Sequence, residues 1–354
     1  MLSKKWGNIC VVGDFSQSIY SFRGANFQNL MTFKNDINGV STFHLSQNYR
    51  STQTILDSAF GVISKNTSHP VLKLWTENQK GEKIILYEAS NEHNEAEYII
   101  SQIINLGLDP RDVAVLYRTN AQSRVIEEVF LHHAVPYALV GGTRFYERKE
   151  VKDILADLRL IDNEKDNVSF RRIEKLGKTR LKKFMDFIGG LNKDSVNTIE
   201  LLDKVIEATD YLSFYDIKDE QDRERLENIK ELRSVAIEFS DLSSFLENVS
   251  LVEQEQLPDH PVKGEKVNAV TLMTLHGAKG LEFPNVFMIG MEEGIFPHSR
   301  SLMEKSELEE ERRLCYVGIT RAKERLFMTY SKRRLIFGQR SNNALSRFIL
   351  DIPK

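Results

Sequence analysis

Two clusters of polar and aromatic residues near the start of the chain have types that suit the binding of an anion or a nucleotide. The first, residues 13–24 (GDFSQSIYSFRG), directly follows the apolar β-branched run Ile9–Val12, which predicts a buried strand of a parallel sheet. The second, residues 47–52 (QNYRST), follows a strand-like segment at residues 41–45 and opens a predicted helix at residues 52–64. Ligands of open α/β sheets bind beyond the carboxyl ends of the strands, so both clusters are candidate binding loops.

Each of these clusters also has a plainer interpretation. A cation at the start of a helix is unfavourable unless an anion lies beside it, so Arg50 favours a bound anion. The alternative is a solvated arginine next to an N-cap Ser51. For residues 13–24 the alternative is a polar loop with two aromatic side chains in the core.

A third cluster, residues 274–283 (TLHGAKGLEF), stands between predicted strands at residues 270–274 and 286–290. Its two glycines let backbone amides approach a ligand closely. His276, Lys279 and Glu282 supply two donors and an acceptor at intervals of three residues. This cluster is therefore a third candidate binding loop.

The fourth cluster, residues 316–322 (YVGITRA), follows an acidic helix predicted at residues 307–313 and places one arginine, Arg321, in an otherwise apolar turn. A lone cation in such a turn is suited to an anionic ligand. Ion pairing with the acids Glu309 to Glu311 is the alternative for Arg321.

The elements that must position these clusters alternate between strands and amphipathic helices. A buried strand at residues 113–117 is followed by a helix with Val125, Ile126, Val129 and Phe130 on one face. Such strand-then-helix units predict an α/β fold with a parallel sheet. Residues 162–248 are instead charged, poor in glycine and helical in period, which predicts an all-α insertion before strand-like segments resume at residue 270.

Composition excludes several classes of protein. With 41% hydrophobic and 28% charged residues and no long apolar run, the sequence has no membrane-spanning segment, and no signal peptide precedes Trp6. Cys10 and Cys315 lie far apart in apolar stretches, which favours a reducing, cytoplasmic compartment. The net charge of −3 does not indicate a nucleic-acid partner, so any such binding must come from local charge placement.

Taken together and in this order, the four clusters are far more specific than any one of them. GDFSQSIYSFRGA, NYRST, TLHGAKGLEF and YVGITRA resemble motifs III, IV, V and VI of superfamily 1 helicases of the UvrD/PcrA/Rep family. Residues 116–124 (LYRTNAQSR), 140–153 (VGGTRFYERKEVKD) and 290–302 (GMEEGIFPHSRSL) also resemble that family, whereas the predicted helical insertion matches it poorly.

The resemblance implies two RecA-like motor domains with ATP, accompanied by Mg²⁺, bound between them. Residues 1–40 would be a remnant of the first motor domain, and residues 41–157 and 266–354 would form the second. Residues 158–265 would be an all-α insertion subdomain within it. The implied activity is ATP-driven, 3′-to-5′ translocation on single-stranded DNA with unwinding of duplex DNA, in repair or replication.

The resemblance also implies roles for individual residues. Arg50 and Arg321 would stabilise charge on the γ-phosphate, and Gln17 would sense that phosphate and the attacking water. Tyr49 would stack on the adenine and Glu282 would contact the sugar. The residues implied to contact DNA are Tyr20, Phe22, Arg23, Arg118, Thr119, Asn120, His276 and Lys279.

Two motifs that such a motor needs are absent from this sequence. No GxxxxGK[ST] phosphate loop and no acidic magnesium-binding motif occur. The nearest match to the phosphate loop, Gly177-Lys178-Thr179, lacks the first glycine, and no buried strand precedes it. The segment at residues 176–183 (LGKTRLKK) is either a degenerate duplex-binding helical hairpin or a solvated basic helix end. We therefore expect the carboxyl portion of a UvrD/PcrA-like helicase that is inactive by itself and that needs the missing N-terminal motor domain.

Two other functions are open. The chain could be a non-catalytic module that binds DNA or a motor partner, although such a module would gain nothing from Arg50 and Arg321. A metal-dependent nuclease is weaker, because the histidines show no ligand spacing with paired acids and no metal site is expected.

Overall fold

The computed structural model describes residues 8–21, 24–37, 39–192, 196–254 and 268–353. Phe22 and Arg23, both predicted to contact DNA, lie outside the described residues. The chain forms two compact units. Unit 1 comprises residues 1–86, 278–328 and 344–354, and unit 2 comprises residues 87–277 and 329–343.

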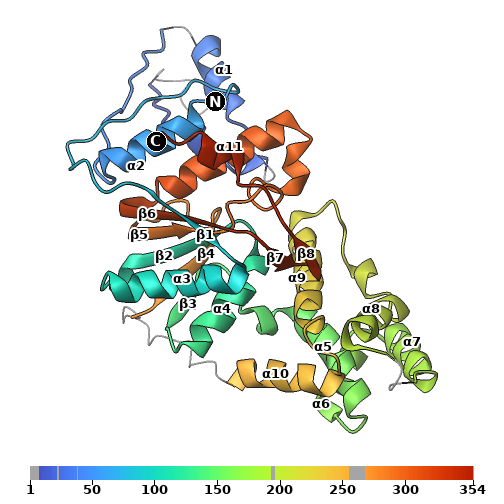
Figure 1. Ribbon diagram of the computed structural model, residues 1–354. Helices are drawn as coiled ribbons and strands as arrows, with labels where there is room; N and C mark the ends of the chain where they lie inside the picture. The colour runs from blue at the N-terminus through green and yellow to red at the C-terminus, as the bar shows by residue number, and fades with distance from the viewer. Residues whose placement is uncertain (1–7, 22–23, 38, 193–195, 255–267, 354) are drawn as a thin grey trace. The chain divides into compact units, whose positions relative to one another are not determined.

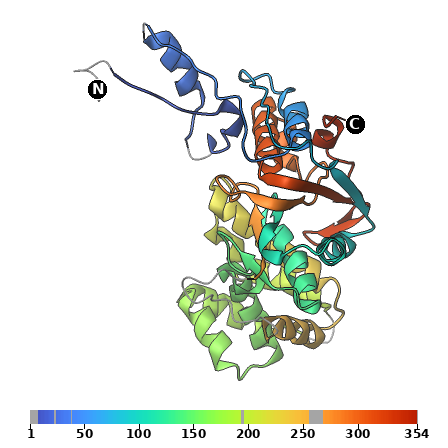
Figure 2. The same ribbon diagram turned by 90° about the vertical axis from the view of Figure 1, so that its left-hand side faces the viewer.

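Unit 1 is organised around helix α11 (Lys305–Ile319), which leads directly into strand β6 (Ala322–Ser331). Strand β5 (Phe283–Met288) pairs with β6 in parallel, with Val286 opposite Leu326. Helix α2 (Gln53–Ile63) packs against α11, as Figures 1 and 2 both show. The apolar residues Ile55, Leu56 and Val62 of α2 are buried. The remaining helices of the unit are η1 (Phe15–Gln17), α1 (Gln28–Asp36), η8 (Ser299–Leu302) and α12 (Arg347–Leu350).

The prediction of two strands in unit 1 is wrong. Residues 9–12 and 41–45 form no strand, and Val12 and Phe43 are 83% and 86% exposed. β-Branched and aromatic residues favour a strand only where a neighbouring strand supplies hydrogen-bond partners and a surface to pack on. Within the described residues the only pairing near either segment is the isolated bridge between Gln47 and Trp75.

Unit 2 contains three parallel strands, with β4 (Val270–Thr274) between β2 (Val113–Tyr117) and β3 (Tyr137–Leu139). Every residue of β2 is buried, as its continuous apolar sequence predicts for a parallel sheet. Helices α3 (Glu92–Asn105) and α4 (Ser123–His132) pack against each other. Strand β1 (Ile85–Ala89) crosses the boundary between the units.

The helical part of unit 2 has a core of its own. Phe184, Leu202, Leu232 and Phe245 are buried together in it. Phe145, from the segment at residues 140–153 that resembles the helicase family, is also buried there. Its helices, seen as one group in Figure 1, are α5 (Lys149–Asp162), α6 (Asn167–Lys175), α7 (Lys178–Gly189), α8 (Thr198–Ala208), α9 (Glu220–Ala236) and α10 (Leu242–Gln254).

The predicted fold class, a parallel α/β domain interrupted by an all-α insertion, is thus confirmed. The predicted domain boundaries stay predictions, and α5 begins at Lys149, nine residues before the predicted start of the insertion at residue 158. None of the described helices is both long and apolar enough to cross a membrane.

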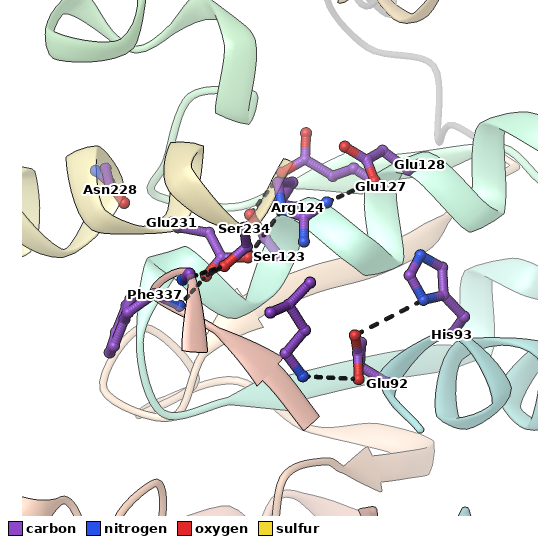
Figure 3. Close-up of polar contacts among 12 residues, drawn as sticks. Glu92, His93, Ser123, Arg124, Glu127, Glu128, Asn228, Glu231, Ser234 and Phe337 are labelled. Atoms are coloured by element: carbon purple, nitrogen blue, oxygen red, sulfur yellow. Dashed lines mark hydrogen bonds and ion pairs between the residues drawn. The ribbon is translucent and has the colours of Figure 1, made fainter. Parts of the chain in front are cut away.

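A buried ion pair ties α4 to α9 within unit 2 (Figure 3). Arg124 of α4 donates from Nε to Glu231 Oε1 at 2.8 Å and from Nη1 to Glu128 Oε2 at 2.8 Å. The second oxygen of Glu231 accepts the backbone N–H of Phe337 at 3.0 Å. Phe337 lies in the turn between β7 (Arg334–Ile336) and β8 (Gln339–Ser341), so one carboxylate joins two helices and a hairpin.

We expect Glu231→Ala to lower the free energy of unfolding by about 3–5 kcal/mol, because it removes the acceptor of the buried Arg124 Nε and of the Phe337 N–H and leaves Arg124 with Glu128 alone. Urea unfolding followed by circular dichroism measures this. Glu207→Ala, at an exposed glutamate of α8, is the matched control and should change stability by less than about 0.5 kcal/mol. Equal losses in the two variants would contradict the role given to Glu231.

A second buried acid of the insertion has no partner. Neither carboxylate oxygen of Asp157 in α5 accepts a hydrogen bond from the described residues. Burial, reinforced by Asp153 and opposed by Arg180, raises the pKa of Asp157 to about 8. The folded protein therefore holds Asp157 protonated at neutral pH, whereas the unfolded chain ionises it.

Because ionisation of Asp157 favours the unfolded chain, stability should fall as pH rises from about 4 to about 8. Asp157→Asn cannot ionise, so its advantage in unfolding free energy should grow across that range by up to about 1.4 kcal/mol per pH unit and level off above it. Urea unfolding at several pH values tests this. Asp186→Asn, at an exposed position of α7, should show a difference from wild type that does not vary with pH.

Candidate functional site

The centre of the candidate site in unit 1 is the buried guanidinium of Arg321, at the junction of α11 and β6. Arg321 is 1% exposed. It donates from Nε to the carbonyl of Val317 (2.9 Å) and from Nη1 to the carbonyl of Leu281 (3.1 Å). Its Nη2 donates to Thr320 Oγ1 (3.0 Å). All three acceptors are neutral, so the charge has no carboxylate partner in the described part of the chain.

The alternative of ion pairing between Arg321 and the acids of α11 is wrong. Glu309 pairs with Arg312 at 3.7 Å, and Glu310 pairs with Arg313 at 3.9 Å. These partners are three residues apart on α11, the spacing that places side chains next to each other on a helix. Arg321 lies beyond the end of that helix, where the same acids do not reach it.

Arg50 approaches the same junction from a turn made by Asn48. Asn48 Oδ1 accepts the backbone N–H groups of Arg50 (2.9 Å) and Ser51 (2.8 Å), which is the local bonding that favours asparagine in turns. Arg50 then donates from Nη1 to the carbonyl of Thr320 at 3.1 Å and from Nε to the Glu282 carboxylate. Thr320 therefore contacts both arginines, one through its carbonyl and one through its hydroxyl.

Backbone contacts fix the Arg50 turn to β6. Ser51 Oγ donates to the carbonyl of Ala322 at 2.6 Å, and the N–H of Thr52 donates to the carbonyl of Lys323 at 3.1 Å. The N-cap of α2 is Thr52 rather than Ser51.

The first N–H groups of α2, at Gln53 and Thr54, are used by the carbonyls of Gln79 and Lys80. The start of α2 is consequently no free anion site. The anion that Arg50 does have is the protein's own Glu282.

Glu282 lies between two cations. Its Oε2 accepts from Arg50, and its Oε1 lies 2.8 Å from the Lys323 ammonium. These two contacts, that of Lys323 first, lower the pKa of Glu282 to about 2. Glu282 is therefore ionised throughout the neutral range.

The loop at residues 13–21 is held against the middle of α11. Asp14 accepts the N–H of Ser16 at 2.9 Å and the side-chain amide of Gln17 at 2.6 Å. Arg313 of α11 donates to the carbonyl of Ser18 at 2.7 Å. These contacts order the loop without the strand that the sequence predicted before it.

Electrostatic effects link three of the cations in unit 1. Burial and then repulsion by Arg50 lower the pKa of Arg321 to about 10, so Arg321 stays charged at neutral pH. Burial also lowers the pKa of Lys279, with Arg321 lowering it further and Asp14 opposing that change. The Lys279 ammonium lies 4.8 Å from the centre of the Tyr20 ring. Cations that disfavour one another's charge are stabilised by an incoming anion.

Tyr49 has most of its ring free, since it is 79% exposed and its hydroxyl donates to Gln47. Among the predicted residues of unit 1, Arg50 contacts Glu282 and Lys279 contacts Tyr20. The unit also contains Gln17, Tyr49 and Arg321.

The remaining predicted contacts belong to unit 2. Gln122 Oε1 accepts the N–H groups of Arg118 (2.9 Å) and Thr119 (3.0 Å), and Asn120 donates to Glu224 at 3.2 Å. His276 lies in the turn after β4. Their predicted role in DNA binding stays a prediction.

Sequence analysis missed Thr320 and Lys323, which contact the predicted residues directly. Thr320 stands in the fourth predicted cluster but had no role assigned to it, and the contact of Lys323 with Glu282 depends on how β5 and β6 pair. Among the described residues, no group of three or more His, Cys, Asp or Glu side chains could hold a metal ion.

Comparison with known proteins identifies the family. Residues 43–213 and 193–333 match the UvrD-like helicase C-terminal domain, and residues 1–38 match the UvrD/REP helicase N-terminal domain. A solved C-terminal domain of a possible DNA helicase from Lactobacillus plantarum aligns over 86% of this chain and 94% of that chain, at 11% identity and a TM-score of 0.38.

Two curated relatives are similar over nearly the whole chain. ATP-dependent DNA helicase PcrA of Bacillus subtilis (strain 168) is 42% identical over 406 residues, covering 99% of this chain and 55% of the relative. PcrA of Staphylococcus aureus (strain Mu50) is 40% identical over 409 residues, covering 100% and 55%. The chain spans about half the length of these relatives. With its four motifs in order and more than half of its length matched, the chain belongs to the UvrD-like helicase C-terminal domain family.

Proposed function

We propose that this chain is the carboxyl portion of an ATP-dependent DNA helicase, in which it supplies the arginines that act on the γ-phosphate of ATP. The observation that carries the proposal is the buried guanidinium of Arg321, which has only neutral acceptors. A buried charge with no carboxylate in direct contact is costly to a fold, and an incoming phosphate would relieve that cost. The PcrA relatives, which are named ATP-dependent DNA helicases, support the same function.

In phosphoryl transfer, charge spreads over the oxygens of the transferred group, and a positioned arginine can accelerate the reaction by about 10³–10⁵-fold. Arg321 is held rigidly by three hydrogen bonds and would act as a fixed charge. Arg50 is more exposed and would turn from Glu282 to the phosphate. Gln17 would orient the attacking water.

The rest of the nucleotide would meet Tyr49 and Glu282. The exposed ring of Tyr49 is suited to stacking on the adenine, and the ionised Glu282 to accepting a hydrogen bond from a sugar hydroxyl. The phosphate loop and the ligands of Mg²⁺ would come from the N-terminal motor domain, since the sequence has no GxxxxGK[ST] segment.

On the DNA side, the proposed activity is 3′-to-5′ translocation along single-stranded DNA with unwinding of the duplex. A motor that reads no sequence grips the backbone with cations and stacks bases on aromatic rings. Tyr20 offers a ring beside the Lys279 ammonium, and Arg118, Thr119, Asn120 and His276 are further candidates. A cytoplasmic role in repair or replication follows from this activity.

Removing either arginine tests the assignment in the protein that joins this chain to its N-terminal motor domain. Arg321→Met and Arg50→Ala should each lower ATP turnover by about 10³-fold or more while changing affinity for single-stranded DNA by less than about threefold. Arg325→Ala, which breaks a surface pair with Glu82, is the control and should leave turnover unchanged. A variant that kept its turnover and lost DNA affinity would refute the roles given to the arginines.

The chain by itself should show no steady-state ATP hydrolysis with saturating single-stranded DNA, because none of its residues can enclose the β- and γ-phosphates. A coupled assay of ADP release measures this. Turnover within about tenfold of a typical enzyme value of about 10 s⁻¹ would contradict the proposal that a second motor domain is required.

A further inference from the structure

Lys323 is a cation of the candidate site to which no motif assigns a role. It is the second residue of β6, two positions after Arg321. Its ammonium lies 2.8 Å from Glu282 Oε1, while Glu282 Oε2 accepts from Arg50. One carboxylate is thus shared between a lysine and an arginine that is proposed to act on ATP.

We propose that Lys323 is a positioning residue that weakens the hold of Glu282 on Arg50, so that Arg50 is released to the γ-phosphate when ATP binds. The inference rests on the proposed function, because it requires Arg50 to act on a phosphate.

Glu282 and Lys323 have opposite electrostatic effects on Arg50. Glu282 attracts Arg50, but Lys323 repels it across the same carboxylate, so the net attraction on Arg50 is smaller than in an isolated ion pair. Arg50 and Glu282 alone would be neutral together, whereas the three side chains carry one net positive charge. An approaching phosphate is therefore attracted to the group as a whole.

The exposure of the three side chains to water decides how easily a phosphate can replace Glu282 as the partner of Arg50. The side chains of Arg50, Glu282 and Lys323 are 29%, 41% and 36% exposed. Ion pairs with such access to water are weak, so a phosphate can displace the carboxylate. The carbonyl of Thr320 would keep its bond to Arg50 Nη1, so that only the Nε side needs to change partner.

The backbone fixes Lys323 where this sharing requires it. In the parallel pair of β5 and β6, Phe283 stands opposite Ala322, and the N–H of Phe283 donates to the carbonyl of Arg321 at 2.9 Å. Glu282 and Lys323 are the neighbours of that pair in sequence. The carbonyl of Lys323 also accepts the N–H of Thr52, two residues after Arg50. The lysine is therefore fixed next to Glu282 by its ammonium and to the segment after Arg50 by its backbone.

A double-mutant cycle separates action through Glu282 from direct action on the nucleotide. The variants are Lys323→Met, Lys323→Arg, Glu282→Gln and the double variant Lys323→Met/Glu282→Gln, in the protein that contains both motor domains. The measurements are kcat and KM for ATP with saturating single-stranded DNA, together with the melting temperature of each variant. Arg50→Ala is measured alongside as the reference for the proposed function.

Lys323→Met should lower kcat/KM about three- to fivefold when Glu282 is present, the size that exposed ion pairs allow, and by less than about 1.5-fold in the Glu282→Gln background. Lys323→Arg should restore the wild-type value, and the melting temperature should stay within about 1 °C. An equal loss in both backgrounds would mean that Lys323 acts on ATP directly, and no loss would mean that it has no role. Either result overturns the inference and leaves the role of Arg50 intact, whereas an active Arg50→Ala variant would overturn the proposed function itself.

Discussion

The arrangement of the candidate site depends on one buried positive charge. Arg321 is enclosed where α11 passes into β6, and its three hydrogen bonds reach the last turn of α11, the segment before β5 and the hydroxyl of Thr320. Hydrogen bonds to charged groups are worth about 1.5–3 kcal/mol each, more than bonds between neutral groups. The charge thereby joins the end of α11 to the segment before β5, and these two segments carry Glu282, Thr320 and Arg321.

The neighbouring groups are organised around that charge in two ways. Thr320 is fixed by Arg321 through its hydroxyl and offers its carbonyl to Arg50, so the position of one arginine affects the other. The Arg50 turn is anchored to the start of β6 by Ser51, so it cannot move independently of the strand. The site therefore combines a rigid, buried cation with a more exposed one.

Some strands and site residues of this chain could be predicted from the sequence alone. Val113–Tyr117 was predictable because a continuous apolar run favours a buried parallel strand, and Val270–Thr274 because it is rich in β-branched and apolar residues. Ile9–Val12 is similarly apolar but forms no strand. The prediction failed there because composition does not reveal whether a partner strand lies alongside. Arg50, Glu282 and Arg321 were predictable as candidates because their motifs are specific in combination.

The rest depended on three-dimensional pairing that no local pattern encodes. Lys323 meets Glu282 only because β5 and β6 pair with Phe283 opposite Ala322. Arg321 pairs with neither Glu309 nor Glu310, because α11 ends before Arg321 and these acids pair with Arg312 and Arg313 on the helix. Asp157 looks like an ordinary helical acid in the sequence, and only packing of the insertion makes it buried and neutral.

Arg321 is proposed to bind a phosphate group, and binding of a simple polyphosphate to this chain tests that role most directly. In a ³¹P NMR titration of tripolyphosphate at low ionic strength, the account predicts a saturable shift of the terminal phosphate that Arg321→Met abolishes while Arg325→Ala preserves it. A shift of equal size in the wild-type and Arg321→Met chains, or no saturable shift in either, would contradict the claim.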